Sequence, residues 1–350
     1  MSAPRSSSPN HLNPRLKFQP RALPSVKEVV EKIRKGEVAA LSRAITLLES
    51  QTDAHRAWSA DLLKSLPALP EQSTFRLGIS GTPGVGKSTF IEAFGLELIR
   101  RGHRIAILAV DPSSSISGGS ILGDKTRMEQ LSHHPAAFIR PSPSGGFLGG
   151  ITRVTRETLL LCESAKFDYI LVETVGVGQS EIAVHGMTDA FLLLAQPGAG
   201  DELQGIKRGI LEMADLLVVN KADLLPNEAK RTAAELRRSL HLAPPRDNGW
   251  SPPVLTAAAL TGTSVDAVAD SVDHYREMLN RDGQLAVLRR KQRAGWLKDS
   301  IHSELLRRLN RSEEVKAVWQ NCLAAIEKGE TDINALSEKI LATFLDTSKT

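Results

Sequence analysis

The spacing of apolar residues divides the chain into a central region and two flanks. Between residue 74 and about residue 272, short apolar runs alternate with longer stretches of helical period. This alternation is typical of βαβ units and predicts an α/β fold, with a mostly parallel sheet covered by helices. The expected strands are 75–80, 104–110, 138–140, 169–172, 190–195, 216–219 and 254–256.

Helical periodicity dominates both flanks. Residues 25–72 contain three short helical patterns, and the C-terminal residues contain three apolar stripes with steps of three and four. Short helices are marginal alone, so we expect the N-terminal ones to pack on the sheet region. The predicted organisation is a disordered tail at 1–24, an N-terminal helical extension at 25–72, an α/β domain at 73–272 and a C-terminal helical region at 273–350.

The composition is that of an intracellular globular protein. The hydrophobic share is 41% and the charged share 24%, close to the averages of soluble domains. No apolar run is long enough for a membrane span, so we expect no membrane insertion. Cys162 and Cys322 form no CxxC pair, which excludes a disulfide framework and a cysteine-built zinc site. We therefore expect a reducing compartment: the cytoplasm, or the mitochondrial matrix if the source is eukaryotic.

The net charge of +4 is modest and unevenly distributed. No acidic residue precedes Glu28, whereas the tail is rich in Arg, Ser and Pro. This composition fits a mitochondrial transit peptide or an ordinary disordered tail, and the prolines favour the tail. The basic run at 289–293 lacks interleaved aromatic residues. It therefore predicts an exposed helix face or an interface rim, and no nucleic-acid site.

A phosphate-binding loop follows the first expected strand. The string GTPGVGKST matches the P-loop pattern in its required setting between a strand and a helix. Its glycines let successive N–H groups face a β-phosphate, and the helix start adds its positive dipole end. We expect Lys87 to reach the β- and γ-phosphates and the Ser88 hydroxyl to hold Mg²⁺. The loop comprises Gly81, Thr82, Pro83, Gly84, Val85, Gly86, Lys87, Ser88 and Thr89.

A base-reading motif follows the strand at 216–219. It consists of Asn220, Lys221, Ala222 and Asp223. The Asp223 carboxylate can accept from N1–H and the exocyclic amine of guanine, whereas adenine presents an acceptor at N1. Such a tetrapeptide can be an ordinary turn, but downstream of a P-loop it predicts guanine selectivity. The backbone amides of Ala258, Ala259 and Leu260, after the last strand, are expected to contact the base.

Three acidic residues are candidates for magnesium. Glu173 ends a strand and precedes Gly176 by three residues, a pattern in which the acid orients a metal-bound water and the glycine amide senses the γ-phosphate. Asp111 and Asp124 flank a Gly/Ser-rich segment that could close over metal and phosphate. A solvated loop acid is the alternative for each.

Two features bear on hydrolysis. The glutamine that follows the switch glycine in Ras-like proteins is absent here, because Gly176 is followed by Val177, and this predicts slow intrinsic hydrolysis. The segment 196–207, with Asp201 and Lys207, follows another strand. Its pattern fits equally a loop at the phosphate edge of the sheet and a surface turn.

Four longer strings carry a family resemblance. The sequences at 108–114, 118–128, 172–180 and 197–207 resemble the MeaB/ArgK GTPases, whose human relative is the methylmalonic aciduria type A protein. The resemblance covers about residue 26 to the C-terminus. It implies a GTP-hydrolysing chaperone of an adenosylcobalamin-dependent acyl-CoA mutase, usually methylmalonyl-CoA mutase. Such a chaperone gates cofactor loading and protects or reactivates the mutase.

The resemblance also implies roles for particular residues and an assembly. Mg²⁺ would be held by Ser88, Asp111, Asp124 and Glu173. The loop around Asp201 and Lys207 would act with Lys87 and Glu173 in partner-stimulated turnover of GTP to GDP. The C-terminal helices would form a homodimer.

Three other functions fit parts of the pattern. A nickel-type metal-insertion GTPase chaperone needs Cys or His ligands near a switch loop, and no such soft-ligand set is visible. A kinase would be expected to use ATP, which the motif at 220–223 disfavours. A binding module with a structural nucleotide would show no GTP turnover.

Overall fold

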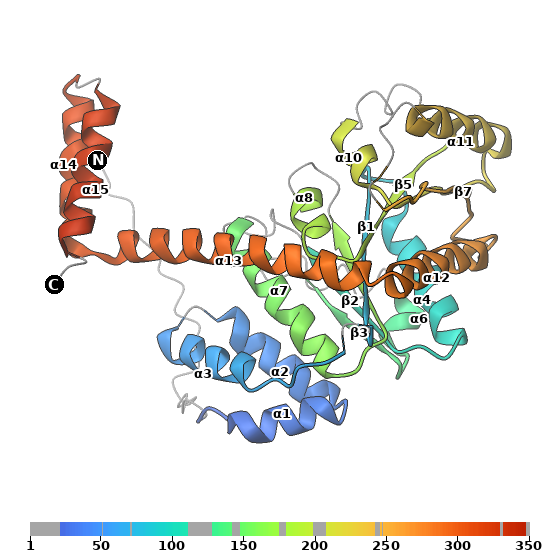
Figure 1. The fold of residues 1–350 in the computed structure, drawn as a ribbon, viewed down its shortest axis with the longest axis horizontal. Coiled ribbons are helices and arrows are strands. Elements are labelled where there is room, and N and C mark those ends of the chain that lie inside the picture. Colours follow the sequence, from blue (N-terminus) through green and yellow to red (C-terminus); the bar gives the residue numbers. More distant parts are fainter. Residues whose placement is uncertain are drawn as a thin grey trace, which may run out of the picture.

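Seven parallel strands form the centre of the molecule in the computed structural model (Figure 1). Their order is β3-β2-β4-β1-β5-β6-β7. The strands are β1 (Phe75–Gly81), β2 (Ile105–Val110), β3 (Ala137–Arg140), β4 (Tyr169–Thr174), β5 (Ala190–Ala195), β6 (Leu216–Val219) and β7 (Val254–Thr256). The predicted α/β fold is confirmed, and each expected strand is present within two residues at its ends. The structure describes residues 22–50, 52–70, 72–110, 128–141, 148–174, 180–198, 208–241, 246, 248–329 and 332–347.

The strand β1 lies at the middle of the sheet, between β4 and β5. All seven of its residues are buried. Ile79 is aligned with Glu173 of β4, and Gly81 is aligned with Leu194 of β5. Parallel strands covered on both faces are continuously apolar, which explains why the sequence identified them. The carboxyl ends of β1, β4, β5 and β6 therefore lie along one edge of the sheet.

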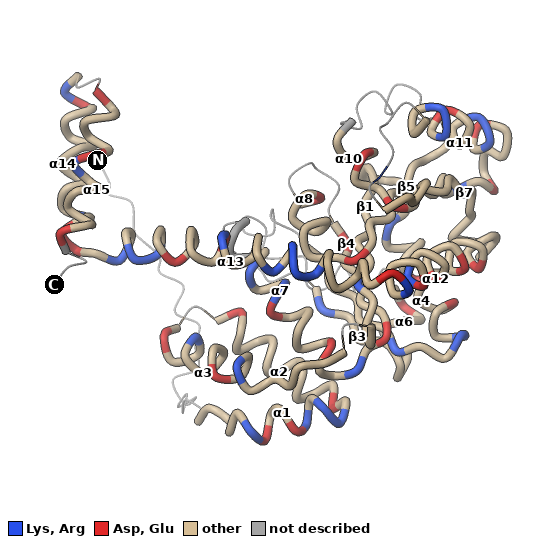
Figure 2. Tube along the Cα trace, viewed as in Figure 1, with Lys and Arg blue, Asp and Glu red and all other residues tan. Residues whose placement is uncertain are grey.

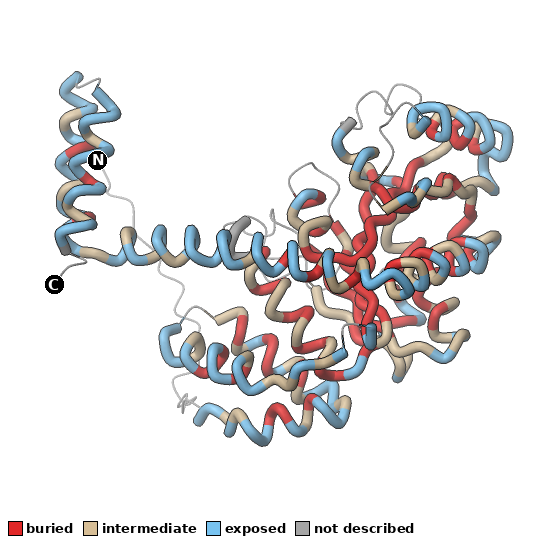
Figure 3. The backbone as a smooth tube through the Cα atoms, viewed as in Figure 1, coloured by how far each residue is buried: buried red, intermediate tan, exposed pale blue. Residues whose placement is uncertain are grey.

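Helices cover both faces of the sheet, and Figure 3 shows the buried strands between them. The helices α4 (Lys87–Arg100), α6 (Glu129–Ser132) and α12 (Val265–Arg281) pack on one face. The other face carries α7 (Leu148–Ser164), α8 (Ser180–His185), α10 (Arg208–Met213) and α11 (Pro226–His241). The predicted domain boundary at residue 272 falls inside α12. Because α12 is buried against the sheet as far as Leu279, we place the boundary after Arg281.

Three N-terminal helices extend the second face. They are α1 (Val26–Arg34), α2 (Val38–Glu49) and α3 (Asp53–Lys64). Ile33, Leu41 and Leu62 are fully buried and belong to the same apolar cluster as the sheet. An ion pair adds to this packing, since Arg140 of β3 donates Nε to Oε1 of Glu49 at 3.0 Å. The short helices are thus stabilised by tertiary packing, as their length requires.

The C-terminal helices leave the body of the molecule (Figure 1). The helix α13 (Gln284–Arg311) begins on the sheet domain and carries a hairpin of α14 (Glu313–Glu327) and α15 (Ile333–Thr347) at its far end. A small core of Val315, Cys322 and Ile340 holds the hairpin together. No helix in the described ranges is both long enough and apolar enough to cross a membrane.

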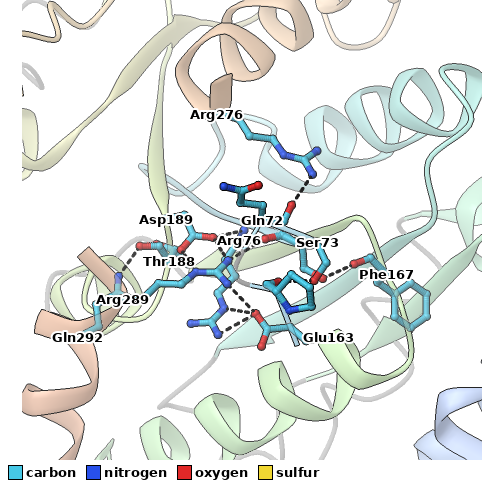
Figure 4. A network of polar contacts seen from close by, with 12 residues as sticks. Gln72, Ser73, Arg76, Glu163, Phe167, Thr188, Asp189, Arg276, Arg289 and Gln292 are labelled. Carbon is cyan, nitrogen blue, oxygen red and sulfur yellow. Dashed lines mark hydrogen bonds and ion pairs between the residues drawn. The ribbon is translucent and has the colours of Figure 1, made fainter. Parts of the chain in front are cut away.

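A buried network of four charged side chains fixes α13 on the sheet domain (Figure 4). Arg289 donates Nε and Nη2 to the two carboxylate oxygens of Asp189, at 2.8 and 2.6 Å. Asp189 also accepts from the backbone N–H of Arg76 at 2.8 Å. The Arg76 side chain donates Nε to Glu163 of α7 at 2.8 Å. Two cations and two anions compensate each other here, and their hydrogen bonds offset the cost of burying them.

The expectation that the whole run 289–293 is exposed is wrong for Arg289. Only 5% of this residue is exposed, whereas Arg290 is exposed as predicted. The physical reason is non-local, because the acids that pair with Arg289 come from α7 and from the residue before β5. A basic run gives no indication of partners that lie so far away in the sequence.

We predict that Arg289→Ala destabilises the protein by about 3–5 kcal/mol, because it leaves the Asp189 carboxylate buried without its cation. Chemical denaturation monitored by circular dichroism measures this change. Arg290→Ala is the matched control, and the exposed substitution should change stability by less than about 0.5 kcal/mol. Equal effects of the two substitutions would contradict this role of the network.

Candidate functional site

The P-loop joins β1 to α4 at the carboxyl edge of the sheet. Gly81 ends β1 and Lys87 begins α4, so the predicted strand, loop and helix are all present. A Cβ at Gly81 would lie 2.6 Å from the carbonyl oxygen of Leu194, so the close approach of β5 requires glycine. Gly86 has φ +91° in the left-handed region, and a Cβ there would lie 2.9 Å from Nδ2 of Asn220. The local backbone therefore depends on glycine at these positions.

Lys87 is folded back over the loop. Its Nζ donates to the carbonyl oxygens of Gly81 at 2.8 Å and Thr82 at 3.2 Å. Burial lowers the pKa of Lys87, while the carboxylates of Glu173 and Glu181 act in the opposite direction. Phosphate oxygens carry charge and are stronger acceptors than these carbonyls. The ammonium is thus placed to exchange its carbonyl contacts for those of a bound phosphate.

The side chains of Ser88 and Glu173 meet beside the P-loop. Ser88 Oγ donates to Oε1 of Glu173 at 3.2 Å. The next residue of β4, Thr174, donates Oγ1 to Oγ of Ser80 at 2.8 Å, which ties the ends of β1 and β4 together. A hydroxyl and a carboxylate are hard oxygen donors of the kind that Mg²⁺ prefers. The donor chemistry of this pair therefore fits the predicted magnesium site.

Several predicted site residues lie outside the described residues. They are Asp111, Asp124, Gly176, Asp201 and Lys207. Among the side chains that the structure describes, no group of three His, Cys, Asp or Glu residues could hold a metal ion. Of the predicted Mg²⁺ ligands, the structure brings together Ser88 and Glu173.

Asn220 joins the P-loop to the loop after β7. Its Nδ2 donates to the carbonyl oxygen of Val85 at 2.9 Å, and its Oδ1 accepts from the N–H of Ala259 at 3.1 Å. Only 1% of Asn220 is exposed. Lys221, with φ +59°, donates Nζ to the carbonyl oxygen of Gly84 at 2.6 Å. Three segments that are far apart in the sequence are thereby held as one unit.

Two of the three backbone amides that are predicted to contact the base donate within the protein. The N–H of Ala258 donates to the carbonyl oxygen of Thr263 at 3.0 Å, and that of Ala259 donates to Asn220. The Leu260 N–H donates to no group in the described part of the chain, and 80% of Leu260 is exposed. Asp223 is also exposed. Among these three amides, the Leu260 N–H is therefore the one that donates to no acceptor in the described residues.

Glu181 belongs to this site, although the sequence alone does not identify it. It lies in the first turn of α8, only 1% of it is exposed, and its carboxylate accepts from Ser180 Oγ at 3.3 Å. Burial lowers the pKa of Lys87, and the negative charge of Glu181 opposes that lowering. An acid in the first turn of the helix after the predicted γ-phosphate-sensing motif was the available signal, because helix N-termini favour carboxylates.

We predict that Asn220→Ala weakens GDP binding at least about tenfold and lowers stability by about 1–3 kcal/mol, because two buried backbone groups lose their partner. Isothermal titration calorimetry and chemical denaturation measure the two effects. Asn321→Ala, at an exposed position on α14, is the control and should change neither. Unaltered GDP affinity in Asn220→Ala would show that the two loops hold the nucleotide independently.

The family model and the related sequences indicate one family. The model of the family described as methylmalonyl Co-A mutase-associated GTPase MeaB matches residues 41–314. The chain is 50% identical over 309 residues to a putative GTPase of Caulobacter vibrioides, covering 88% of this chain and 94% of that one. It is 43% identical over 325 residues to the GTPase ArgK of Escherichia coli, covering 91% and 98%.

A mammalian relative and a solved structure extend the comparison. The mitochondrial methylmalonic aciduria type A homolog of Mus musculus is 47% identical over 284 residues, covering 78% of this chain and 68% of that one. A crystal structure described as LAO/AO transport system kinase superposes with a TM-score of 0.72 at 35% identity. That match covers 92% of this chain and 99% of the other.

Proposed function

This chain belongs to the MeaB family of GTPases, and we propose that its hydrolysis of GTP gates the loading of adenosylcobalamin into an acyl-CoA mutase, protecting or reactivating it. The Asn220 bridge carries the nucleotide part of the proposal, because it joins the phosphate loop to both candidate base-reading segments. The mutase part is supported by the family description, which names methylmalonyl-CoA mutase, and by the mouse relative. Methylmalonyl-CoA mutase is the partner that we propose.

Each residue of the site has its own role in the proposed binding and hydrolysis of GTP. The P-loop amides and Lys87 bind the β- and γ-phosphates, and Asp223 selects guanine. Ser88 and Glu173, together with Asp111 and Asp124, would hold Mg²⁺, which neutralises charge on the transferred phosphoryl group. Water attacks the γ-phosphorus, the bond to the β-phosphate oxygen breaks, and GDP and phosphate leave. The Gly176 amide distinguishes GTP from GDP by contacting the γ-phosphate.

The partner would act on the segment that contains Asp201 and Lys207. Intrinsic turnover is expected to be slow, because no glutamine directly follows Gly176. A mutase that orders this segment beside the γ-phosphate would accelerate hydrolysis. Such coupling is reciprocal, so the mutase would also bind the GTP and GDP forms with different affinities.

The alternative of a nickel-type metal-insertion GTPase chaperone has less support. Within the described ranges, no group of three His, Cys, Asp or Glu residues could hold a metal ion. Cys162 lies buried on α7 and Cys322 in the core of the C-terminal hairpin, so neither is exposed to receive a metal. The mutase chaperone is therefore the function we favour.

We further propose that the protein is a homodimer formed by its C-terminal helices. Beyond the buried network, the outward face of α13 exposes Leu297, Ile301 and Leu305, each by about half or more. Figure 3 shows this arm and its hairpin as mostly exposed. Contiguous apolar surface of this kind is unusual on a monomer and indicates an interaction face.

We predict that Asp223→Asn shifts the base preference from guanine towards xanthine. The carboxamide oxygen can accept from the N1–H of either base, but its NH₂ faces the exocyclic amine of guanine, a donor, and the C2 carbonyl of xanthine, an acceptor. Affinity for the guanine nucleotide should therefore fall about tenfold or more. Calorimetric titration with GDP and XDP measures the ratio. Glu228→Gln, on α11, is the control. An unchanged ratio in Asp223→Asn would remove Asp223 from the base site.

We predict that methylmalonyl-CoA mutase stimulates GTP turnover by the wild type and that Lys207→Ala loses this stimulation. The physical reason is that a partner-ordered segment supplies charge near the γ-phosphate. Phosphate release is measured with and without the mutase, and Lys230→Ala, on α11, serves as the control. Turnover that no cobalamin-dependent mutase changes, with equal mutase binding in both nucleotide states, would contradict the proposed coupling.

A further inference from the structure

Glu181 is a buried acid whose charge is poorly compensated. Three acidic residues are buried in the described part of the chain: Glu181, Asp189 and Asp215. Asp189 and Asp215 each form an ion pair with an arginine. Glu181 forms no ion pair with a described residue, and the one hydrogen bond that it accepts, at 3.3 Å, comes from the Ser180 hydroxyl. A buried carboxylate without a cation is costly, so its presence calls for an explanation.

No cation on the same helix can supply the missing charge. The sequence of α8 is SEIAVH, which contains no Lys or Arg. Figure 2 shows this short helix with its acidic position at one end and uncharged residues along most of its length. The only basic residue on α8 is His185, which lies four residues further on and has its pKa lowered by burial. A partner for Glu181 must therefore come from another element.

The packing of α8 on β1 places Glu181 at the phosphate loop. The chain leaves β4 at the carboxyl edge of the sheet and enters the parallel strand β5 at the other edge, so α8 runs antiparallel to β1. A Cβ at Gly78 would lie 2.9 Å from Cγ1 of Val184, which shows how closely the two elements approach. Val184 follows Glu181 by three residues, and Gly78 precedes Gly81 by three. Helical side chains lean towards the helix N-terminus, so the Glu181 carboxylate extends towards the end of β1.

Lys87 is the cation that this position approaches. The negative charge of Glu181 opposes the lowering of the Lys87 pKa by burial, as does that of Glu173. An ammonium has three N–H donors. Two of those of Lys87 reach acceptors in the described chain, the carbonyl oxygens of Gly81 and Thr82. A third N–H therefore remains for a carboxylate.

We propose that Glu181 is a positioning residue for GTP hydrolysis, whose carboxylate accepts an N–H of Lys87 when nucleotide is bound and holds the ammonium against the γ-phosphate. The inference rests on the proposed turnover of GTP. Glu173 serves a different purpose, because its carboxylate accepts from Ser88 at the predicted magnesium site. Protein kinases hold their phosphate-binding lysine with a glutamate on a helix in the same way. Since Glu181 lies on α8 and Lys87 on α4, the position of the ammonium then depends on how α8 packs on the sheet.

The first test removes the charge of Glu181 and keeps its shape. Glu181→Gln retains an oxygen for the Ser180 hydroxyl but holds Lys87 less firmly, so single-turnover hydrolysis of saturating GTP should slow at least about tenfold. The affinity for GDP should stay within about threefold of the wild type, because the lost contact acts on the γ-phosphate that GDP lacks. Phosphate release and calorimetric titration measure the two quantities.

Thermal unfolding separates this role from a structural one. Glu181→Gln should be at least as stable as the wild type, because a neutral amide replaces a buried charge that no described cation pairs with. Asp215→Asn is the matched contrast, since Asp215 is a buried acid at the opposite edge of the sheet and is paired with Arg246. It should lose stability and leave the hydrolysis rate of the folded protein unchanged.

The second test is a double-mutant cycle with Lys87→Arg, which keeps a cation but replaces the ammonium. If Glu181 acts through that ammonium, its substitution should matter much less once the ammonium is gone. In the Lys87→Arg background, Glu181→Gln should therefore slow single-turnover hydrolysis by less than about threefold.

Every other outcome overturns the proposal. A wild type that does not hydrolyse GTP, alone or with the mutase, overturns the proposed function together with this inference. Wild-type hydrolysis that Glu181→Gln leaves unchanged overturns the role of Glu181 and retains the GTPase. A Glu181→Gln variant that unfolds, or that loses GDP affinity as strongly as turnover, makes Glu181 a structural acid. Equal slowing in both Lys87 backgrounds shows that Glu181 does not act through Lys87.

Discussion

The side-chain amide of Asn220 is the interaction on which the nucleotide site depends. One amide spans the P-loop and the loop after β7, with contacts of 2.9 and 3.1 Å to backbone groups. Because Asn220 is buried, both contacts are made away from solvent, where an unsatisfied partner would be costly. Gly86 must lack a side chain so that the amide can approach, which links the glycines of the phosphate loop to the base-reading motif.

A buried network of charged side chains lies at the opposite edge of the sheet, where the strands begin. The network of Arg76, Asp189, Glu163 and Arg289 lies at the starts of β1 and β5, whereas the nucleotide site lies at their ends. The short helix α8 connects the two edges. The helix α8 begins after residues 175–179, which contain the predicted γ-phosphate sensor. The residues that follow α8 are hydrogen-bonded to α13, since Gln292 donates Nε2 to the carbonyl oxygen of Thr188 at 2.7 Å. The C-terminal arm is thus attached directly behind this helix.

Sequence reasoning succeeded where the signal is local and failed where it depends on distant partners. The strands were predicted because buried parallel strands are continuously apolar, and the P-loop because its glycines and lysine are contiguous. The burial of Arg289 could not be predicted, since its partner Asp189 is 100 residues away. Likewise, the engagement of the Ala258 amide depends on a bridge to Thr263 that only the folded loop reveals. The roles of Asp111, Asp124, Asp201 and Lys207 stay predictions.

The most direct test of the account is the base preference of the wild-type site. Calorimetric titrations with GDP and ADP, each with Mg²⁺ and at the same ionic strength, compare the affinities of two nucleotides that differ only in the base. The account predicts that GDP binds at least about a hundredfold more tightly than ADP, because adenine leaves the Asp223 carboxylate and the Leu260 amide without complementary partners. Equal affinities for GDP and ADP would contradict it.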